Sequence, residues 1–337
     1  MYFDRDADLA DLAGETVAVI GYGVQGRAFA ANLRDSGLRV LVGNRDDAYR
    51  DAARADGFAP LPIADAVERA SAVLLLIPDE AHPEVYDAQI APHLGDGDLF
   101  VLAHGFSVRF GRIRLPIEAD AALLAPKMFG RPIRRHYLEG TGVLAFLDVL
   151  QDPTGRALRR TLAVAKATGF TRRGVMPVPH AQETELDLFQ EQFLTPLLMD
   201  GFKMAFDVLV DAGYDPVPAL LDMYASGEMA EMMTEAATVG LYEVIAEQGS
   251  PTCRFGVQRR LGTLLGDDVE AKARKILGEI RSGAFAAALE EEAGAGYPSL
   301  DAYDAMAGAS GVTRAHERYR AALDPRPAVG PGRTASD

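Results

Sequence analysis

The chain has 337 residues, of which 48% are hydrophobic and 25% charged, and its formal net charge at pH 7 is −15. This composition predicts a globular protein with a large core, and the length favours two domains. Because nucleic acids and anionic membranes attract clusters of Lys and Arg, the acidic balance argues against both as partners. The single cysteine, Cys253, excludes an internal disulfide and fits a reducing compartment.

The N-terminal stretch MYFDRDADLADLAGE is acidic, whereas a secretory signal needs a basic start followed by an apolar core. The sequence also contains no run of the ~18 apolar residues that a membrane span needs. We therefore expect a cytoplasmic protein.

The stretch VAVIGYGVQGRAFAANLRDSG, residues 17–37, predicts a buried strand, a glycine turn and a helix. In this order the pattern G-x-G-x-x-G is typical of a dinucleotide site, and the alternative is a merely tight turn. Gly21 would permit the turn, Gly23 would let a pyrophosphate approach the backbone, and Gly26 would let the helix pack on the strand. The unpaired N–H groups of the helix N-terminus would face the phosphates. The expected cofactor-binding residues here are Gly21, Tyr22, Gly23, Val24, Gln25 and Gly26.

A second group of cofactor-binding residues is expected near the end of the second strand, in VGNRDDAYRD. The candidates are Asn44, Arg45, Asp46 and Asp47. Arg45 suits the 2′-phosphate of NADPH, whereas the two aspartates would repel a phosphate and could accept hydrogen bonds from a free ribose hydroxyl. Either NADH or NADPH is therefore expected, and the aspartates favour NADH.

Residues 1–180 alternate between apolar runs and segments with helical spacing. The apolar runs are TVAVIG, RVLVGN, SAVLLLIPD, DLFVLAHG, AALLAPKM and TGVLAFLDVLQD. Alternating strands and helices predict a Rossmann-like α/β domain with a mostly parallel sheet and crossover helices on both faces.

The proline-containing stretch RRGVMPVP marks the end of this first domain. Over residues 181–323, long amphipathic stretches rich in Leu, Met and Ala predict an all-α second domain. Residues 324–337, DPRPAVGPGRTASD, are expected to form a disordered tail.

Two acidic residues in ETELDLFQEQF, Asp187 and Glu191, stand four positions apart and would share one helix face beside apolar neighbours. Two carboxylates next to buried surface repel each other unless protons or a cation neutralise them. Their oxygen ligands would suit Mg²⁺. The alternative is a solvated acidic helix face, which periodicity alone would favour.

Several stretches together resemble the ketol-acid reductoisomerases, the acetohydroxyacid isomeroreductases of branched-chain amino-acid synthesis. They are VAVIGYGVQGRAFAANLRDSG, VLAHGF, APK, ETELDLFQEQ, DAGYDP and ILGEIRSGAFA, which occur in the family's order and at nearly its spacing. The resemblance covers residues 1 to about 290, and the length matches the family's short form. It implies a nicotinamide-binding Rossmann domain, a knotted helical domain, and two Mg²⁺ sites at the interface of a homodimer or higher homo-oligomer.

The resemblance also implies roles for individual residues. Asp187 falls on the family's bridging Mg²⁺ ligand, and Glu191 falls on the carboxylate that completes the shell of the first metal. His104 of HGF and Lys127 of APK fall on polar residues at the carboxyl ends of sheet strands, where open α/β sheets bind ligands. Ser250 of QGSPTCRFG falls on the substrate-contacting serine.

The implied reaction acts on a small keto or hydroxy acid. Mg²⁺ would chelate the adjacent oxygens of a 2-acetohydroxy acid and favour alkyl migration. NADH or NADPH would then reduce the new ketone to give a 2,3-dihydroxy acid.

Two departures from the family's pattern lie in the substrate region. Where the family has Lys-Gly-Pro-Gly-His, this chain places Met and Phe after Lys127. Where the family has two glutamates four apart, the stretch LLDMYASGEMAEMM offers Asp222 for the first. The second position falls on Ser226, unless a local insertion lets Glu228 serve.

These departures leave alternatives open. One is harmless drift, and another is a divergent paralogue that reduces a different 2-keto acid or an imine-like substrate without alkyl migration. A metal-independent reductase would not need the paired acids, and a non-catalytic nucleotide sensor would tolerate loss of His104 and Lys127. Metal dependence and an isomerised product separate these hypotheses.

Overall fold

The computed structural model describes residues 1–323, which divide into two units between Asp187 and Leu188. The division falls inside helix α8 (His180–Phe189), and the domain boundary predicted after residue 180 lies at the start of the same helix. The predicted disordered tail, residues 324–337, lies outside the described residues.

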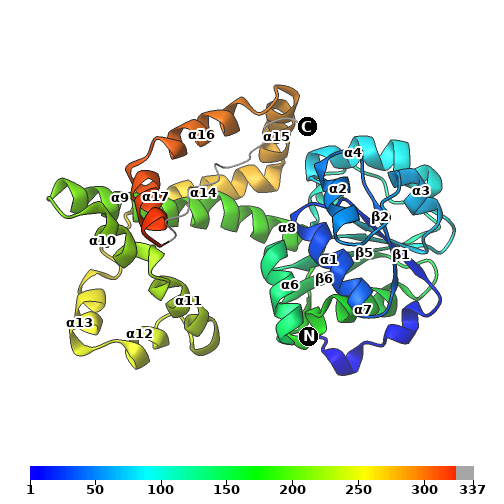
Figure 1. The fold of residues 1–337 in the computed structure, drawn as a ribbon, viewed down its shortest axis with the longest axis horizontal. Helices are drawn as coiled ribbons and strands as arrows, with labels where there is room; N and C mark the ends of the chain where they lie inside the picture. The colour runs from blue at the N-terminus through cyan, green and yellow to red at the C-terminus, as the bar shows by residue number, and fades with distance from the viewer. Residues whose placement is uncertain (324–337) are drawn as a thin grey trace. The chain divides into compact units, whose positions relative to one another are not determined.

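The first unit contains a seven-stranded sheet with the strand order β2-β1-β3-β4-β5-β6-β7. Helices flank this sheet in Figure 1. The strands are β1 (Thr16–Ile20), β2 (Arg39–Gly43), β3 (Ala72–Leu75), β4 (Leu99–Leu102), β5 (Asp120–Pro126), β6 (Ala145–Gln151) and β7 (Val175–Pro177). Strands β1 to β5 pair in parallel, β6 runs antiparallel to β5, and β7 pairs in parallel with β6. The predicted mostly parallel, Rossmann-like sheet is confirmed.

Helices and short turns connect these strands. The helices are α1 (Val24–Asp35), α2 (Ala48–Ala55), α3 (Ile63–Glu68), α4 (His82–Val85), α5 (Phe106–Arg109), α6 (Gly130–Glu139) and α7 (Ala157–Thr168). The turns are η1 (Asp4–Asp6), η2 (Leu9–Leu12), η3 (Asp79–Ala81), η4 (Tyr86–Ile90), η5 (Ala91–His93) and η6 (Phe170–Arg172).

The core of this unit has two layers, one on each face of the sheet. Alternate residues of β1 enter different layers, because side chains along a strand point to opposite faces. Val17 and Val19 pack with α1 and α7, whereas Ala18 and Ile20 pack with α3 and η4. All five residues of β1 are buried, which explains its continuous apolar sequence.

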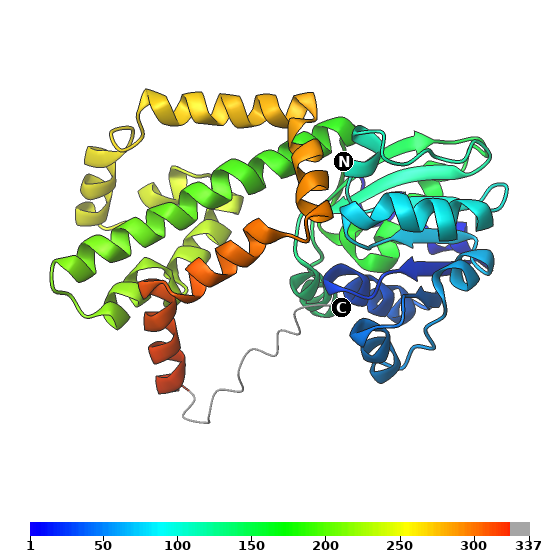
Figure 2. The same cartoon turned by 90° about the horizontal axis from the view of Figure 1, so that it is seen from above.

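In the second unit, residues 188–323 form helices and turns and contain no strand (Figure 2). Its elements are η7 (Gln190–Leu194), α9 (Thr195–Asp211), α10 (Pro216–Leu220), η8 (Leu221–Ala225), α11 (Glu228–Val239), α12 (Glu243–Gln248), α13 (Pro251–Arg260), α14 (Asp267–Ser282), α15 (Ala284–Gly294), α16 (Pro298–Gly308) and α17 (Gly311–Leu323). A small core joins α9, α10 and α17 through Phe206, Leu220 and Ala315. Across residues 1–323, every helix is too short or too polar to cross a membrane.

Candidate functional site

The glycine loop follows β1 and leads directly into α1. Gly21 has φ +93°, and a Cβ on this residue would lie 2.7 Å from the carbonyl oxygen of Leu76. A Cβ on Gly26 would lie 1.9 Å from the carbonyl oxygen of Gly21. At Gly23, by contrast, an added Cβ would meet no atom within 4 Å. The backbone is therefore open at the position where a pyrophosphate would approach, and closely packed on either side.

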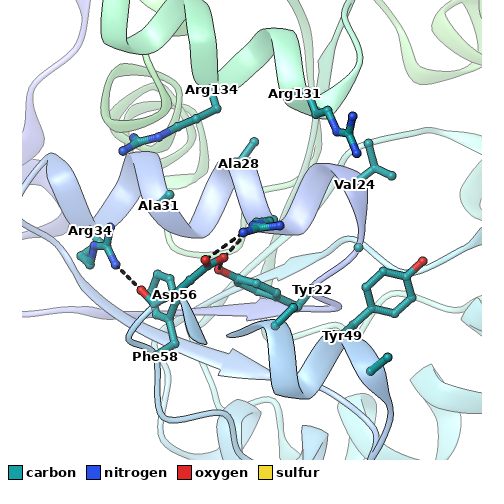
Figure 3. Close-up of a pocket in the computed structure, with 15 residues that line it drawn as sticks. Tyr22, Val24, Ala28, Ala31, Arg34, Tyr49, Asp56, Phe58, Arg131 and Arg134 are labelled. Atoms are coloured by element: carbon teal, nitrogen blue, oxygen red, sulfur yellow. Dashed lines mark hydrogen bonds and ion pairs between the residues drawn. The ribbon is translucent and has the colours of Figure 1, made fainter. Parts of the chain in front are cut away.

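Tyr22 anchors this loop at two points. Its backbone N–H donates to Asn44 Oδ1 at 3.0 Å, and its hydroxyl donates to Asp56 Oδ2 at 2.8 Å (Figure 3). Arg27 of α1 forms a 2.6 Å ion pair with the same carboxylate. Burial raises the pKa of Asp56, but the hydrogen bonds from Arg27 and Tyr22 outweigh this effect and lower it. Asn44 and Asp56 thus tie the glycine loop to both ends of the β2–α2 segment.

The two aspartates of the β2–α2 loop have different environments. Asp47 is the N-cap of α2, and its carboxylate accepts hydrogen bonds from the backbone N–H groups of Tyr49 and Arg50 at 2.9 and 3.1 Å. The Arg45 Nε also donates to Asp47, at 2.7 Å. The Asp46 side chain is 86% exposed and lies 3.6 Å from Arg50 Nη1. Asp47 therefore stabilises the loop, whereas Asp46 faces solvent.

A polar cluster lies at the carboxyl ends of three neighbouring strands. Asp79 follows β3, His104 follows β4, and Lys127 follows β5, so the parallel pairing places all three at one sheet edge. Helix α8 adds Glu183 from its first turn and Asp187 from near its C-terminal end. The possible ligand atoms of His104, Glu183 and Asp187 all lie within 4.8 Å of one another.

Lys127 and His104 approach Asp187 from two sides. Lys127 Nζ forms an ion pair with Asp187 Oδ1, lies 3.8 Å from Glu183 Oε1, and stands over the ring of Phe146. His104 Nε2 lies 3.7 Å from Asp187 Oδ2. The buried Glu183 accepts the backbone N–H of Gly105 at 3.0 Å, which ties α8 to the segment that carries His104.

The charges in this cluster depend on one another. Burial lowers the pKa of His104, but the hydrogen bond and charge of Asp79, with the charges of Glu183 and Asp187, raise it to about 9. Burial raises the pKa of Glu183, against the charges of His104 and Lys127. The cluster therefore holds acidic groups whose desolvation is only partly offset by neighbouring cations.

This donor set fits a hard divalent cation such as Mg²⁺. Glu183 and Asp187 stand one helical turn apart, and carboxylate oxygens are the ligands that Mg²⁺ prefers. The buried Nε2 of His104 has no hydrogen-bond partner among the described residues, so a polar group is missing opposite it. A cation or a polar substrate atom bound in this space would contact the two carboxylates and give His104 Nε2 a partner.

The other residues predicted for the site belong to the second unit. Glu191 lies in the π turn η7, Asp222 lies in the π turn η8, and Ser250 is the N-cap of α13, where its Oγ accepts the N–H of Cys253. Helix α11 begins at Glu228, after Gly227 with φ +92° has ended the preceding turn. Asp222 and Glu228, six positions apart, therefore lie on separate helical segments.

Two residues of the cluster were not among the sequence-based candidates. Glu183 precedes Asp187 by the same four positions that separate Asp187 from Glu191, so the spacing itself could have identified it. Asp79 follows the buried strand in SAVLLLIPD, but its approach to His104 depends on the pairing of β3 with β4.

A separate cavity of about 660 Å³ begins at Gly23 and Val24 and follows α1 as far as Arg34 (Figure 3). Its polar lining includes Arg27, which is paired with Asp56, and Arg134, which is paired with Asp35. Among its lining residues it includes none of the polar cluster at the sheet edge. The cavity therefore borders the glycine loop on the side of α1 and α6.

Two known protein families match consecutive parts of the chain. Residues 11–174 match the family described as "Acetohydroxy acid isomeroreductase, NADPH-binding domain". Residues 180–324 match the family described as "Ketol-acid reductoisomerase, C-terminal domain".

Individual relatives agree with these matches. The "Ketol-acid reductoisomerase (NADP(+))" of Caldivirga maquilingensis is 41% identical over 288 residues, which are 85% of this chain and 87% of that protein. Its counterpart in Sulfurisphaera tokodaii is 39% identical over 303 residues, or 89% of this chain and 90% of that protein. A solved NADH-preferring ketol-acid reductoisomerase from an uncultured archaeon superposes with a TM-score of 0.90 at 34% identity, covering 95% of this chain and 98% of the other. The chain belongs to the ketol-acid reductoisomerase family.

Proposed function

We propose that this protein is a Mg²⁺-dependent ketol-acid reductoisomerase that converts a 2-acetohydroxy acid into a 2,3-dihydroxy acid with NADH or NADPH. The observation that carries the proposal is the convergence of His104, Lys127, Glu183 and Asp187 at the sheet edge onto which the glycine loop also opens. Relatives about 40% identical in sequence to this chain are named ketol-acid reductoisomerases.

The residues of the cluster suit the chemistry of this reaction. When bound, Mg²⁺ supplies Lewis acidity to the adjacent oxygens of the substrate, and the reduced nicotinamide supplies hydride. Asp187 and Glu183 would hold the metal, with Glu191 added by family resemblance. Lys127 keeps Asp187 oriented through its ion pair, and His104 presents Nε2 to the same space, where it can exchange a proton or share a hydrogen bond with the substrate.

By family resemblance we also propose Asp222, Glu228 and Ser250 as metal- or substrate-binding residues. We propose a homodimer or higher homo-oligomer, because helices of the second unit expose large apolar side chains that a monomer would leave in water. Examples are Met204, Val208 and Phe255, each more than 60% exposed. The substrate in this proposal is a small keto or hydroxy acid.

For the cofactor we propose a preference for NADH over NADPH. Arg45 of the β2–α2 loop and Arg50 of α2 are both close to carboxylates, Arg45 to Asp47 and Arg50 to Asp46. A 2′-phosphate would have to compete with these carboxylates and would meet the exposed charge of Asp46. The similarity to a solved NADH-preferring enzyme supports the same choice, although the relatives at about 40% identity are named for NADP⁺.

A second candidate function is reduction of a different 2-keto acid or an imine-like substrate without alkyl migration. Two observations favour it. Met128 and Phe129, directly after Lys127, are 38% and 80% exposed and would present bulky apolar surface there. The break at Gly227 separates the two acids, Asp222 and Glu228, that would complete the metal site.

The deciding experiment follows NADH and NADPH oxidation by the purified protein with racemic 2-acetolactate, with Mg²⁺ or with a chelator. The same assay is then run with the already rearranged keto acid, 3-hydroxy-3-methyl-2-oxobutyrate. Mg²⁺-dependent formation of the dihydroxy acid from acetolactate supports the reductoisomerase. Turnover of the rearranged keto acid alone supports the second candidate, and no turnover of either substrate contradicts the first.

A further inference from the structure

We propose that Asp79 is a positioning residue of this site, which holds His104 in the tautomer and orientation that turn Nε2 toward Asp187. This inference deepens the proposed function and rests on it for the identity of the reaction. The contact that carries it joins Asp79 Oδ2 to His104 Nδ1 at 3.1 Å.

The sheet brings Asp79 and His104 together. Strands β3 and β4 pair in parallel with Leu75 opposite Leu102, so the segments that leave their carboxyl ends run side by side. Asp79 begins the turn η3 after β3, and His104 lies two residues beyond β4. Residues 25 positions apart in the chain thus form one polar pair.

A buried histidine braces the two segments. His82, at the start of α4, lies with Nε2 3.1 Å from the carbonyl oxygen of Ile77 and with Nδ1 2.8 Å from Ser107 Oγ. Ile77 precedes Asp79 by two residues, and Ser107 follows His104 by three. His82 and Ser107 are both nearly inaccessible to water, so the hydrogen bond between them is buried. The loop that carries Asp79 is therefore held against the segment that carries His104.

The groups around His104 favour the observed orientation of its ring. Asp79 is an acceptor, so it fixes the proton of His104 on Nδ1. Nε2 then becomes the nitrogen that faces Asp187, 3.7 Å away. Phe106 stacks on the ring, and Glu183 fixes the next residue through the Gly105 N–H. A carboxylate that orients a working histidine in this way is a recurring arrangement in enzyme sites.

The first test measures the tautomer directly, by NMR of the full-length protein labelled with ¹⁵N-histidine. The His104 signals are assigned by their loss in His104→Gln, and the tautomer is read on the neutral ring. We expect Nδ1 to carry the proton in the unmodified protein. A proton found on Nε2 overturns the proposal, whether or not any variant folds.

The second test uses Asp79→Asn, Asp79→Glu and a matched control. Asn can donate to the ring as well as accept, so we expect Asp79→Asn to populate the Nε2-protonated tautomer. We expect kcat to fall by roughly 10- to 100-fold, the range found when a supporting residue of a site is lost, while KM for the cofactor stays unchanged. Asp79→Glu should retain the tautomer and restore part of kcat. Asp87→Asn, which removes an exposed carboxylate from η4, should behave as the unmodified protein.

The two readouts separate this inference from the proposed function. If the unmodified protein turns over neither acetolactate nor the rearranged keto acid, the proposed function fails, and the tautomer measurement still decides the role of Asp79. If turnover is present and Asp79→Asn keeps both its kcat and its tautomer, the role of Asp79 fails alone.

Discussion

The hydroxyl of Tyr22, in the glycine loop, donates a 2.8 Å hydrogen bond to Asp56, the residue that follows α2. The two residues stand 34 positions apart, and the bond ties the cofactor loop to the segment after the second strand. Asp56 lies outside the G-x-G-x-x-G motif, but its hydrogen bond with Tyr22 helps to hold the loop that this motif forms.

Replacing Tyr22 by Phe should lower the free energy of unfolding by about 1.5–3 kcal/mol, because the hydrogen bond to a charged acceptor is lost. KM for the cofactor should rise as the loop loosens, while the backbone bond from Tyr22 to Asn44 remains. Urea unfolding and cofactor titration measure the two effects. Tyr303→Phe, at a half-exposed position of α16, is the control and should change neither. An unchanged stability in Tyr22→Phe would show that the tie does not support the loop.

The glycines of the loop should respond differently to an added methyl group. Gly23→Ala meets open space and has an ordinary φ, so the protein should fold with unchanged stability but bind cofactor more weakly. In Gly26→Ala the methyl group would overlap the Gly21 carbonyl oxygen, so both stability and cofactor binding should fall. Thermal unfolding with and without NADH distinguishes the two outcomes. Equal destabilisation by both variants would contradict the separate roles of these glycines.

The fold of the first unit could be predicted because its strands are short, continuous apolar runs separated by helical spacing. Burial on both faces of a parallel sheet imposes that pattern on β1, β3 and β4. The π turns η7 and η8 could not be predicted in the same way. They interrupt helical segments whose spacing still looks regular, and only tertiary packing decides where such a turn forms.

Site residues could be predicted from the sequence where they lie in a motif of the family. His104, Lys127 and Asp187 lie in such motifs and come together in the structure. Glu183 shares the four-residue spacing of Asp187 and Glu191, so it could have been identified from the sequence, whereas the approach of Asp79 to His104 depends on non-local strand pairing and could not. The Asp47 carboxylate caps α2, because the first backbone N–H groups of this helix have no partner within the helix.

Stability should depend on pH through His82. Burial lowers the pKa of this histidine below its ordinary value of 6.5, against the opposing charges of Asp79 and Glu80 and with that of His104. The unfolded chain therefore binds the proton more readily, so His82 should reduce stability as the pH falls below 6.5 toward the folded pKa.

The His82→Gln variant tests this dependence. It removes the ionisable ring but keeps a polar side chain that can bond to Ile77 or Ser107. Urea unfolding of both proteins between pH 5 and pH 8, a range around the reference pKa of about 6.5, should show a shallower acid limb in the variant. Parallel curves for the two proteins would exclude His82 as a source of the acid sensitivity.

Asp187→Asn should abolish Mg²⁺-dependent turnover and leave NADH binding intact. The substitution removes the carboxylate charge at the centre of the cluster, whereas the glycine loop is untouched. Calorimetric Mg²⁺ titration and NADH fluorescence measure the two properties separately. Asp200→Asn, at an exposed position of α9, is the control. Full activity in Asp187→Asn would rule out Asp187 as a metal ligand.

Cofactor choice should respond to Asp46 more than to its neighbours. Asp46→Ser removes the exposed carboxylate from the β2–α2 loop and leaves Arg50 available to a 2′-phosphate. An exposed charge contributes about 1 kcal/mol at contact distance in water, so kcat/KM for NADPH relative to NADH should rise about fivefold. Asp51→Asn, which removes an exposed carboxylate one turn further along α2, is the matched control and should leave the ratio unchanged. A gain in the control equal to that of Asp46→Ser would mean that general surface charge, and not the position of Asp46, sets the preference.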